Sequence, residues 1–500
     1  MIDVKFYEAI AMTSLASKFT PQQEKPYSQK EWQRGYQSQR REESYELEII
    51  SGSVPNSLQG TLFRNGPGLL DINGIPVQHP FDGDGMICQF SFQEGKVHFQ
   101  NRFVHTQGFM EEQEAGTILY RNVFGTQKPG GFLKNAFDFK QKNIANTNVI
   151  YWGNKLLALW EGGLPHRLDA KTLETLGTDQ LNGILGEKDA FSAHPWVEPQ
   201  SVLNNNQPCL INFYIEPGLS TTIHTYEFDT NFKLLRKQSN SVPGFAFIHD
   251  FAITPHYYIF FQNPVKFNPI PFALGLRGAG ECIKFYPEEN SQVWVIPRDE
   301  NSSEGVKKLE VNAGFIFHHG NAFEVNNQQL CVDSICYADF PEVDPDSDFR
   351  DVDFEALYPG QLWRFTLNLE TETVDKELVE PRCCEFPEIH PDKVGQPYRY
   401  LFMATAHQPR GNAPLQGILK YDWETQERLV WSAAPHGFVS EPIFVPKPDC
   451  QGEDEGWILT LVYNGKKHRS ELVILEGKTL EETARLGLKY HIPYGLHGSW

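Results

Sequence analysis

Several features that commonly identify an enzyme or a membrane protein are missing from this chain of 500 residues. No apolar run approaches the ~20 residues that a membrane-spanning helix needs. The N-terminus lacks the basic and apolar regions of a signal peptide. The HExxH pattern of metalloproteases, the GxSxG nucleophile pattern and the phosphate-binding loop are also absent. We therefore expect a chain that is soluble or at most sits on a membrane surface.

Disulfide pairing and excess positive charge are likewise not indicated. The eight cysteines form no CxxC pair, and Cys383 and Cys384 are adjacent, which is a poor geometry for bridging each other. They are typical of reduced thiols in a cytoplasmic protein. The net charge of −20 and the pI near 5.3 repel phosphate backbones, and no basic run offsets this charge. We expect a cytoplasmic protein that does not bind nucleic acid.

The composition instead favours one large domain rich in aromatic side chains. Residues 1–44, largely polar beyond residue 12, are predicted to form an N-terminal arm that is partly disordered, and residues 45–500 a single domain. Aromatic residues make up 13% of the chain, with 36 phenylalanines, although the mean hydropathy is only −0.44. This apolar surplus must either fill a core or line a cavity.

A repeated hairpin pattern predicts the fold class. An apolar strand, a turn that begins with a small or polar residue and a second extended run recur at residues 167–176, 226–235, 363–373, 419–427 and 473–480. Such repeats favour the antiparallel blades of an all-β propeller, with a pair of β-sandwiches as the alternative. Two inserts, residues 105–145 and 267–276, could cap one end of it. Within the first, Phe132, Leu133, Ala136 and Phe139 are spaced for one helix face.

Four histidines stand out because each lies in or beside an apolar or aromatic stretch. They are His194, His249, His318 and His497. They are too far apart in the chain to share a helix or hairpin, but the inner strands of a propeller could bring them together at its axis. Taken singly, a buried histidine is more often a hydrogen-bonded core residue. Taken together, four convergent imidazoles indicate a metal site. His319 would face away from His318 on a strand.

Three acidic residues stand alone in apolar or aromatic strings, namely Glu161, Glu385 and Glu441. Carboxylates behind neutral imidazole ligands accept the free ring N–H groups and balance the charge of the metal. An ordinary salt bridge or backbone contact remains an equally good explanation for any one of them.

The motifs closely resemble those of the carotenoid cleavage oxygenases, and especially of the apocarotenoid-cleaving members. The resemblance extends from about residue 27 to the C-terminus. It is carried by residues 60–68, 79–86, 247–250, 317–324, 385–387, 441–446 and 496–498.

The resemblance implies a seven-bladed propeller with a helical and loop dome over an axial iron site. It implies that His194, His249, His318 and His497 hold Fe²⁺, with Glu161, Glu385 and Glu441 behind three of them. Thr147 corresponds to a position that crowds one open iron site. The substrate tunnel is expected near Phe81, Trp160, Phe247 and Phe317.

The implied activity is cleavage of one conjugated double bond of an apocarotenoid by O₂ to give two carbonyl products, with retinal as the expected product. Cleavage of full-length carotenoids or stilbene-like compounds is an alternative, an isomerohydrolase is a remote third, and a metal-free propeller that only binds partners is a different class. No obligatory protein partner is evident. The two apolar inserts suggest peripheral contact with a membrane.

One segment departs from the family pattern. After His194 the sequence reads Pro195-Trp196-Val197-Glu198, where the family often has a basic residue and an aspartate. The departure leaves the histidine in place but leaves open how the surrounding segment packs.

Overall fold

The computed structural model describes residues 25–218, 220–340 and 348–500. The first 24 residues of the expected N-terminal arm lie outside this part of the chain. The rest of the arm contains α1 (Gln29–Arg34), and its Trp32 is buried against Phe354 and Tyr494. Residues 25–43 therefore lie against the body of the protein.

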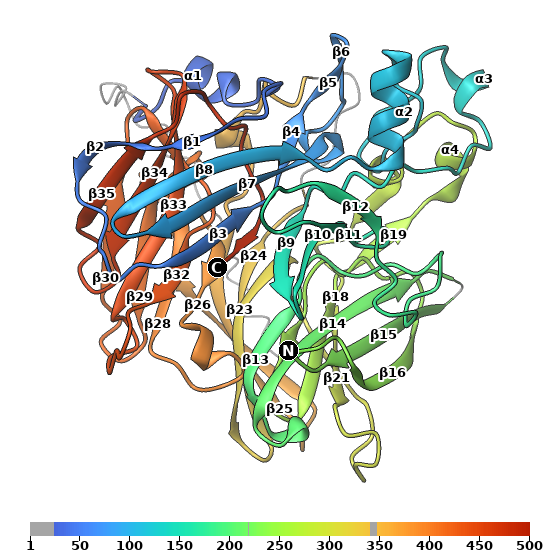
Figure 1. Ribbon diagram of the computed structural model, residues 1–500. Helices are drawn as coiled ribbons and strands as arrows, with labels where there is room; N and C mark the ends of the chain where they lie inside the picture. Colours follow the sequence, from blue (N-terminus) through green and yellow to red (C-terminus); the bar gives the residue numbers. More distant parts are fainter. Residues whose placement is uncertain (1–24, 219, 341–347) are drawn as a thin grey trace, which may run out of the picture.

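Seven antiparallel sheets surround a common axis and form the blades of a β-propeller, as expected (Figure 1). The first blade contains β1 (Ser44–Glu46), β3 (Gly60–Arg64), β4 (Pro67–Leu69), β7 (Asp84–Gln93), β8 (Lys96–Phe103) and β36 (Gly498–Ser499). The second contains β9 (Asn148–Trp152), β10 (Lys155–Leu159), β11 (His166–Leu168) and β12 (Thr175–Thr178). The third contains β13 (Trp196–Ser201), β14 (Gln207–Glu216), β15 (Ser220–Phe228) and β16 (Leu234–Pro243).

The remaining blades follow in chain order. The fourth contains β17 (Ala252–Ile253), β18 (Tyr257–Gln262), β21 (Ser291–Pro297) and β22 (Lys307–Val311). The fifth contains β23 (Phe315–Asn326), β24 (Gln329–Tyr337), β25 (Gln361–Asn368) and β26 (Thr373–Glu380). The sixth contains β27 (Cys384–Glu388), β28 (Tyr400–Ala406), β29 (Leu415–Asp422) and β30 (Arg428–Ser432). The seventh contains β2 (Glu48–Gly52), β31 (Gly437–Val439), β32 (Ile443–Pro446), β33 (Gly456–Asn464), β34 (Arg469–Glu476) and β35 (Glu482–Gly487).

The five repeated segments all form the hairpin between the third and fourth strands of a blade, counted outward from the axis. In the second blade, Asp169 Oδ1 accepts hydrogen bonds from the backbone N–H groups of Lys171 and Thr172, at 2.9 and 2.8 Å. Asn368 makes the same pair of contacts in the fifth blade. An acidic or amide side chain that satisfies its own turn explains why the signal recurs at this position.

The middle strands of the blades are buried on both faces because each blade packs between two others. All six residues of β18, for example, are buried. Their apolar side chains join those of neighbouring blades in shared core clusters. This sheet-on-sheet packing accounts for much of the apolar content noted in the sequence. Seven of the eight cysteines are buried free thiols, and Cys450 is partly exposed.

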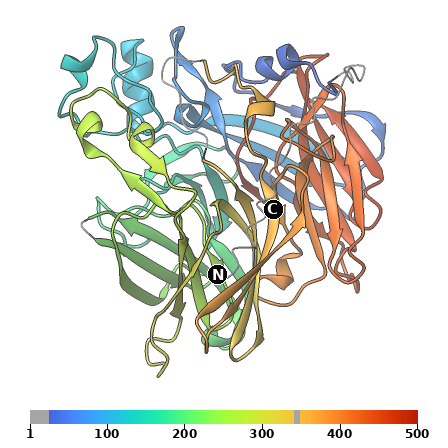
Figure 2. The same cartoon turned by 180° about the vertical axis from the view of Figure 1, so that it is seen from behind.

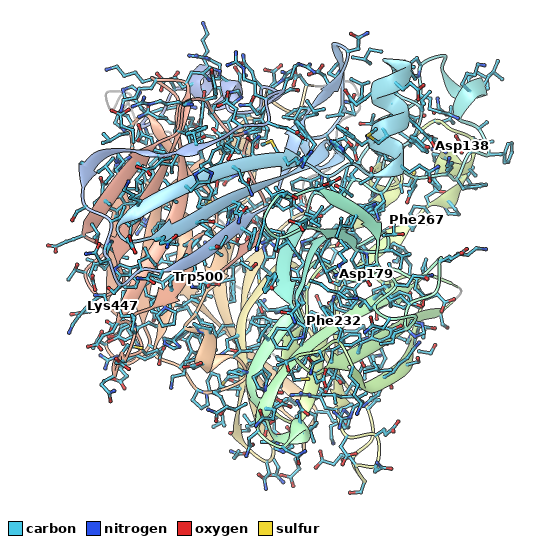
Figure 3. All side chains as sticks on the ribbon, viewed as in Figure 1. Asp138, Asp179, Phe232, Phe267, Lys447 and Trp500 are labelled. Carbon is cyan, nitrogen blue, oxygen red and sulfur yellow. The ribbon has the colours of Figure 1, made fainter. Side chains whose placement is uncertain are left out.

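The two ends of the chain close the ring of blades. β2 pairs with β35, so an N-terminal strand completes the seventh blade. At the other end β36 pairs with β3 of the first blade, with Phe63 opposite Ser499 and Arg64 opposite Gly498. Trp500, which is labelled in Figure 3, contacts Phe92 of the first blade, with ring centroids 5.4 Å apart. The C-terminal segment is thus anchored by backbone pairing.

The inserts form a dome at one end of the propeller. It includes α2 (Gln107–Ala115), α3 (Phe132–Asn135), α4 (Pro269–Ala273), and the strand pairs β5 (Asp71–Ile72) with β6 (Ile75–Pro76) and β19 (Val265–Phe267) with β20 (Ile283–Phe285). Both views show these elements together above the blades (Figures 1 and 2). No helix in the described ranges is both long and apolar enough to cross a bilayer.

The helix indicated by the spacing of residues 132–139 is shorter than expected. α3 ends at Asn135, and Phe137 adopts a left-handed backbone conformation with φ 57°. The side chains of Phe132, Leu133 and Phe139 are 56%, 78% and 58% exposed, so they form no buried helix face. The helical spacing was misleading here because the backbone leaves the helical region at Ala136 and Phe137, and Phe139 instead contacts Phe272 of α4.

A buried charge network connects the third and fourth blades. Arg298, which follows β21, is 0% exposed and donates from Nη1 and Nη2 to the two carboxylate oxygens of Glu198, at 3.0 and 2.7 Å. Its Nε donates to Glu227 Oε1 at 2.8 Å. Glu198, which departs from the family pattern, therefore has a defined structural partner.

Replacing Arg298 with methionine should lower the free energy of unfolding by about 3–5 kcal/mol, because the buried Glu198 would lose its paired cation and the buried Glu227 would keep only Arg236. Chemical denaturation measures this change. Lys308→Met, which breaks an exposed pair with Glu310, is the control and should cost less than about 1 kcal/mol. Equal losses in the two variants would show that the buried network does not stabilise the contact between these blades.

Candidate metal centre

Four histidines from different blades meet at the propeller axis. His194 and His249 precede the innermost strands β13 and β17, His318 lies within β23, and His497 precedes β36. One potential ligand atom from each ring lies within 4.8 Å of those from the other three. The Nε2 atoms of His194 and His249 are 2.8 Å apart. Two nitrogens that bind one cation at about 2.1 Å and at right angles are about 3 Å apart, so this spacing suits a shared ion.

Three of the rings are held from behind by carboxylates. The Nδ1–H groups of His249, His318 and His497 donate to Glu161, Glu385 and Glu441, at 2.7, 2.6 and 2.7 Å respectively. A carboxylate can only accept, so each contact fixes the tautomer with the proton on Nδ1 and leaves Nε2 available. His318 Nε2 is buried and has no hydrogen-bond partner among the described residues. A cation bound by the four rings would satisfy this atom, so the donor set fits a metal ion.

Burial and the neighbouring charged groups together set the pKa values of His194, His318 and His497. Burial lowers the pKa of His194 well below the ordinary value, and the neighbouring rings of His249 and His497 lower it further. Burial also lowers the pKa of His497, despite the opposing effect of Glu441. Burial disfavours the charged form of His318 as well, but Glu385 outweighs it and raises the pKa. Neutral imidazoles are the form that binds metals, and at His318 a cation would take the place of the second proton.

Two side chains that the sequence did not single out support the carboxylates. Arg64, on β3, pairs with Glu441 and also donates from Nη2 to the carbonyl oxygen of Leu496 at 3.1 Å. The Tyr337 hydroxyl donates to Glu385 Oε1 at 2.8 Å. Arg64 lies in the resembling segment 60–68, which was the only available signal for it. Tyr337 lies in an ordinary apolar strand pattern and gave no signal.

His319 does not join the cluster. Its Nδ1 contacts the Ser334 hydroxyl at 2.8 Å and its ring lies 5.3 Å from that of Phe261. The adjacent ring of His318 faces the axis. The two neighbours therefore point in different directions, and only His318 meets the other three rings.

A cavity of about 180 Å³ borders the histidines on the side of the apolar residues. All five positions expected near a tunnel line it: Phe81, Thr147, Trp160, Phe247 and Phe317. Phe124 and Phe386 complete an aromatic wall that was not expected from the sequence. The Thr147 carbonyl accepts the N–H of His497 at 3.1 Å, which places Thr147 beside the cluster. This arrangement can hold an apolar molecule directly against the rings of His249, His318 and His497.

A smaller cavity of about 110 Å³ also reaches the histidines and has more polar walls. Asn148, Asp250 and Trp196 contribute to it. Trp196 Nε1 donates to the carbonyl oxygen of Phe251 at 2.6 Å. The unusual tryptophan after His194 thus connects that segment to the one that carries His249.

The sequence and the structure both match known proteins over most of the chain. A family model described as retinal pigment epithelial membrane protein matches residues 36–500. The chain is 55% identical to an apocarotenoid-15,15′-oxygenase of Synechocystis sp. over 480 residues, which is 95% of this chain and 97% of that protein. It is 28% identical to resveratrol cleavage oxygenase 1 of Botryotinia fuckeliana, covering 90% of this chain and 82% of that protein. A solved structure of a cobalt-substituted Synechocystis apocarotenoid oxygenase superposes with a TM-score of 0.93 at 55% identity, covering 95% and 99% of the two chains.

Proposed function

This chain belongs to the retinal pigment epithelial membrane protein family of carotenoid oxygenases, and we propose that it cleaves a conjugated double bond of an apocarotenoid with O₂. The products would be two carbonyl compounds, with retinal expected from apocarotenals. One O₂ and one C=C bond give two C=O groups without an added reductant. The observation that carries the proposal is the convergence of four imidazoles at the end of an aromatic cavity.

We further propose that His194, His249, His318 and His497 hold Fe²⁺. Bound there, Fe²⁺ would supply the activation of O₂ that the reaction needs. Glu161, Glu385 and Glu441 keep the Nδ1 protons of three rings in place, and they carry the negative charge that offsets a dication. Addition of one O₂ to one C=C bond gives two C=O groups with no net gain or loss of a proton, so the proposal assigns no acid or base to the cavity wall.

The cavity would position the substrate and exclude water. Trp160, Phe247 and Phe317 present flat apolar surfaces suited to a polyene, and Phe317 lies 5.6 Å from the ring of His249. Thr147 lies on the same wall, where it would restrict access to one side of the ion. In this arrangement the aromatic walls select the bond that is cleaved.

Purified protein reconstituted with Fe²⁺ without oxygen should bind one equivalent of iron. His249→Ala should lose most of the iron and the cleavage activity, because one of four ligands and the partner of Glu161 disappear. Metal analysis and product chromatography measure both. His256→Ala, which removes an exposed histidine paired with Glu324, is the matched control and should change neither. Two results together would instead favour a metal-free protein that only binds partners. The wild-type protein would hold no iron, and the His249→Ala substitution would not change its properties.

Chromatography of products from apocarotenals of graded length should show retinal. Phe317→Ala should lower kcat/KM about 10-fold to 100-fold, since it removes one aromatic wall from the bound polyene. Tyr358→Ala, at an exposed aromatic outside the cavity, should leave kcat/KM unchanged. Turnover of full-length carotenoids or stilbenes in preference to apocarotenals would overturn the proposed substrate class.

We also propose that the dome contacts a membrane and admits the lipophilic substrate from it. Leu133 and Ile270, on α3 and α4, are 78% and 66% exposed. Figure 3 shows Asp138 and Phe267 in the same dome. These apolar side chains face water, and the proposed substrate is lipophilic. Such a surface is suited to the interfacial region of a bilayer.

Replacing Leu133 and Ile270 together with serine should reduce flotation with phosphatidylcholine liposomes several-fold, because the apolar contact with the lipid is lost. The control pair is Val325→Ser with Leu378→Ser, two exposed apolar residues of the fifth blade. Unchanged flotation of the dome variant would contradict membrane contact at this site.

A further inference from the structure

The strand that carries His318 contains a bulge at that residue. In the pairing of β23 with β24, Ile316 lies opposite Cys336, but His319 lies opposite Ser334. Phe317 and His318 therefore share the single opposing residue Ile335. An extra residue of this kind changes the direction of the side chains around it. The bulge explains how the consecutive residues Phe317 and His318 can both face the cavity, while His319 points the other way as in an ordinary strand.

The carboxylate of Asp250 accepts a hydrogen bond from the backbone of this bulge. Asp250 follows His249 directly and is 6% exposed. Its Oδ2 accepts the backbone N–H of His319 at 2.8 Å, and its Oδ1 accepts the N–H of Phe251 at 2.7 Å. One side chain therefore joins the segment before β17 in the fourth blade to the bulge of β23 in the fifth. Each of these two segments carries one of the four clustered histidines.

We infer that Asp250 is a positioning residue, which sets the spacing of His249 and His318 by binding the two segments to each other. This inference rests on the proposed function, because the spacing matters only if the rings share an ion. The three glutamates orient single rings about their own Nδ1 atoms. Asp250 instead acts on the backbone and fixes the distance between two histidines from different blades.

A carboxylate suits this position better than an amide. Two N–H donors face Asp250, and an ionised carboxylate offers acceptors on both oxygens. An asparagine has nearly the same shape but would place its own N–H group against one of the two backbone donors. Asp250→Asn therefore leaves one of the two backbone donors facing an N–H group and weakens the connection between the segments without opening a cavity.

The test measures Co²⁺ binding to the metal-free full-length protein, since a solved relative is cobalt-substituted. Asp250→Asn should weaken Co²⁺ affinity about 10-fold to 100-fold, in line with the loss of other residues that hold metal ligands in place. It should also shift the visible absorption bands of the bound Co²⁺, because the ligand geometry changes. With Fe²⁺ and substrate, kcat should fall more than KM rises.

Asp454→Asn is the matched control. Asp454 is similarly buried, at 8% exposed, but pairs with Lys420 in the outer part of the sixth and seventh blades. It should lower stability while leaving the Co²⁺ affinity within about twofold and the absorption bands unchanged. A weaker affinity in Asp250→Asn with unshifted bands would overturn the inference, because lost charge alone would then explain it.

A second measurement uses only the wild-type protein, so it can be made even if Asp250→Asn does not fold. Hydrogen exchange of metal-free wild-type protein should show the peptide containing His319 as strongly protected as β24, since its amide is held before any ion binds. Rapid exchange there would overturn the inference. If the wild-type protein binds no Co²⁺, the proposed function itself is refuted. If the wild-type protein binds Co²⁺ and Asp250→Asn binds it equally well, only the role of Asp250 is refuted.

Discussion

The structure depends on a single geometric constraint, namely that four imidazoles from different blades must reach one point on the axis. Each ring is on or just before an innermost strand, so an error in the position of any of these four blades would displace its histidine. The constraint is demanding at His497, which lies near the end of the chain. Its position depends on the pairing of β36 with β3, which also joins the last segment of the chain to the first blade.

Closure of the ring and assembly of the centre are therefore the same event at this point of the molecule. Arg64 on β3 pairs with Glu441 of the seventh blade, and Glu441 in turn accepts from His497. The same carboxylate accepts the N–H of Gly498 at 2.9 Å. A stabilising contact between the first and last blades thus also orients one ring. Stability and function are coupled here because they use the same atoms.

The two cavities beside the histidines differ in chemistry. The larger is walled by aromatic rings and meets the cluster on the side of Phe317 and Trp160. The smaller has polar groups, including Asp250 and Asn148, and belongs to the framework that holds the rings. The aromatic walls lie mainly in the larger cavity, although Glu161 and Glu385 also border it. The aromatic surface and the groups that hold the rings therefore meet at the histidines.

The sequence alone was sufficient for the elements whose signal is local. The turn residues of the outer hairpins satisfy their own backbone, so they repeat visibly and predict the blades. The four histidines and three glutamates were recognisable because polar residues interrupt apolar or aromatic strings, and the family motifs then distinguished them from ordinary core residues. The spacing of residues 132–139 misled because the backbone leaves the helical region at Ala136 and Phe137, which the apolar period does not reveal.

Only the tertiary structure decided which groups hold the centre together. Arg64, Tyr337 and Asp250 act through contacts with residues hundreds or tens of positions away, and nothing in their local sequence marks those contacts. Strand alternation predicts that His318 and His319 point in opposite directions, but the presentation of both Phe317 and His318 to the cavity depends on a bulge in the pairing with β24, where Asp250 accepts the N–H of His319. Local periodicity can determine strands and turns, but the spacing between blades is fixed by backbone hydrogen bonds and buried charges that form only when the ring closes.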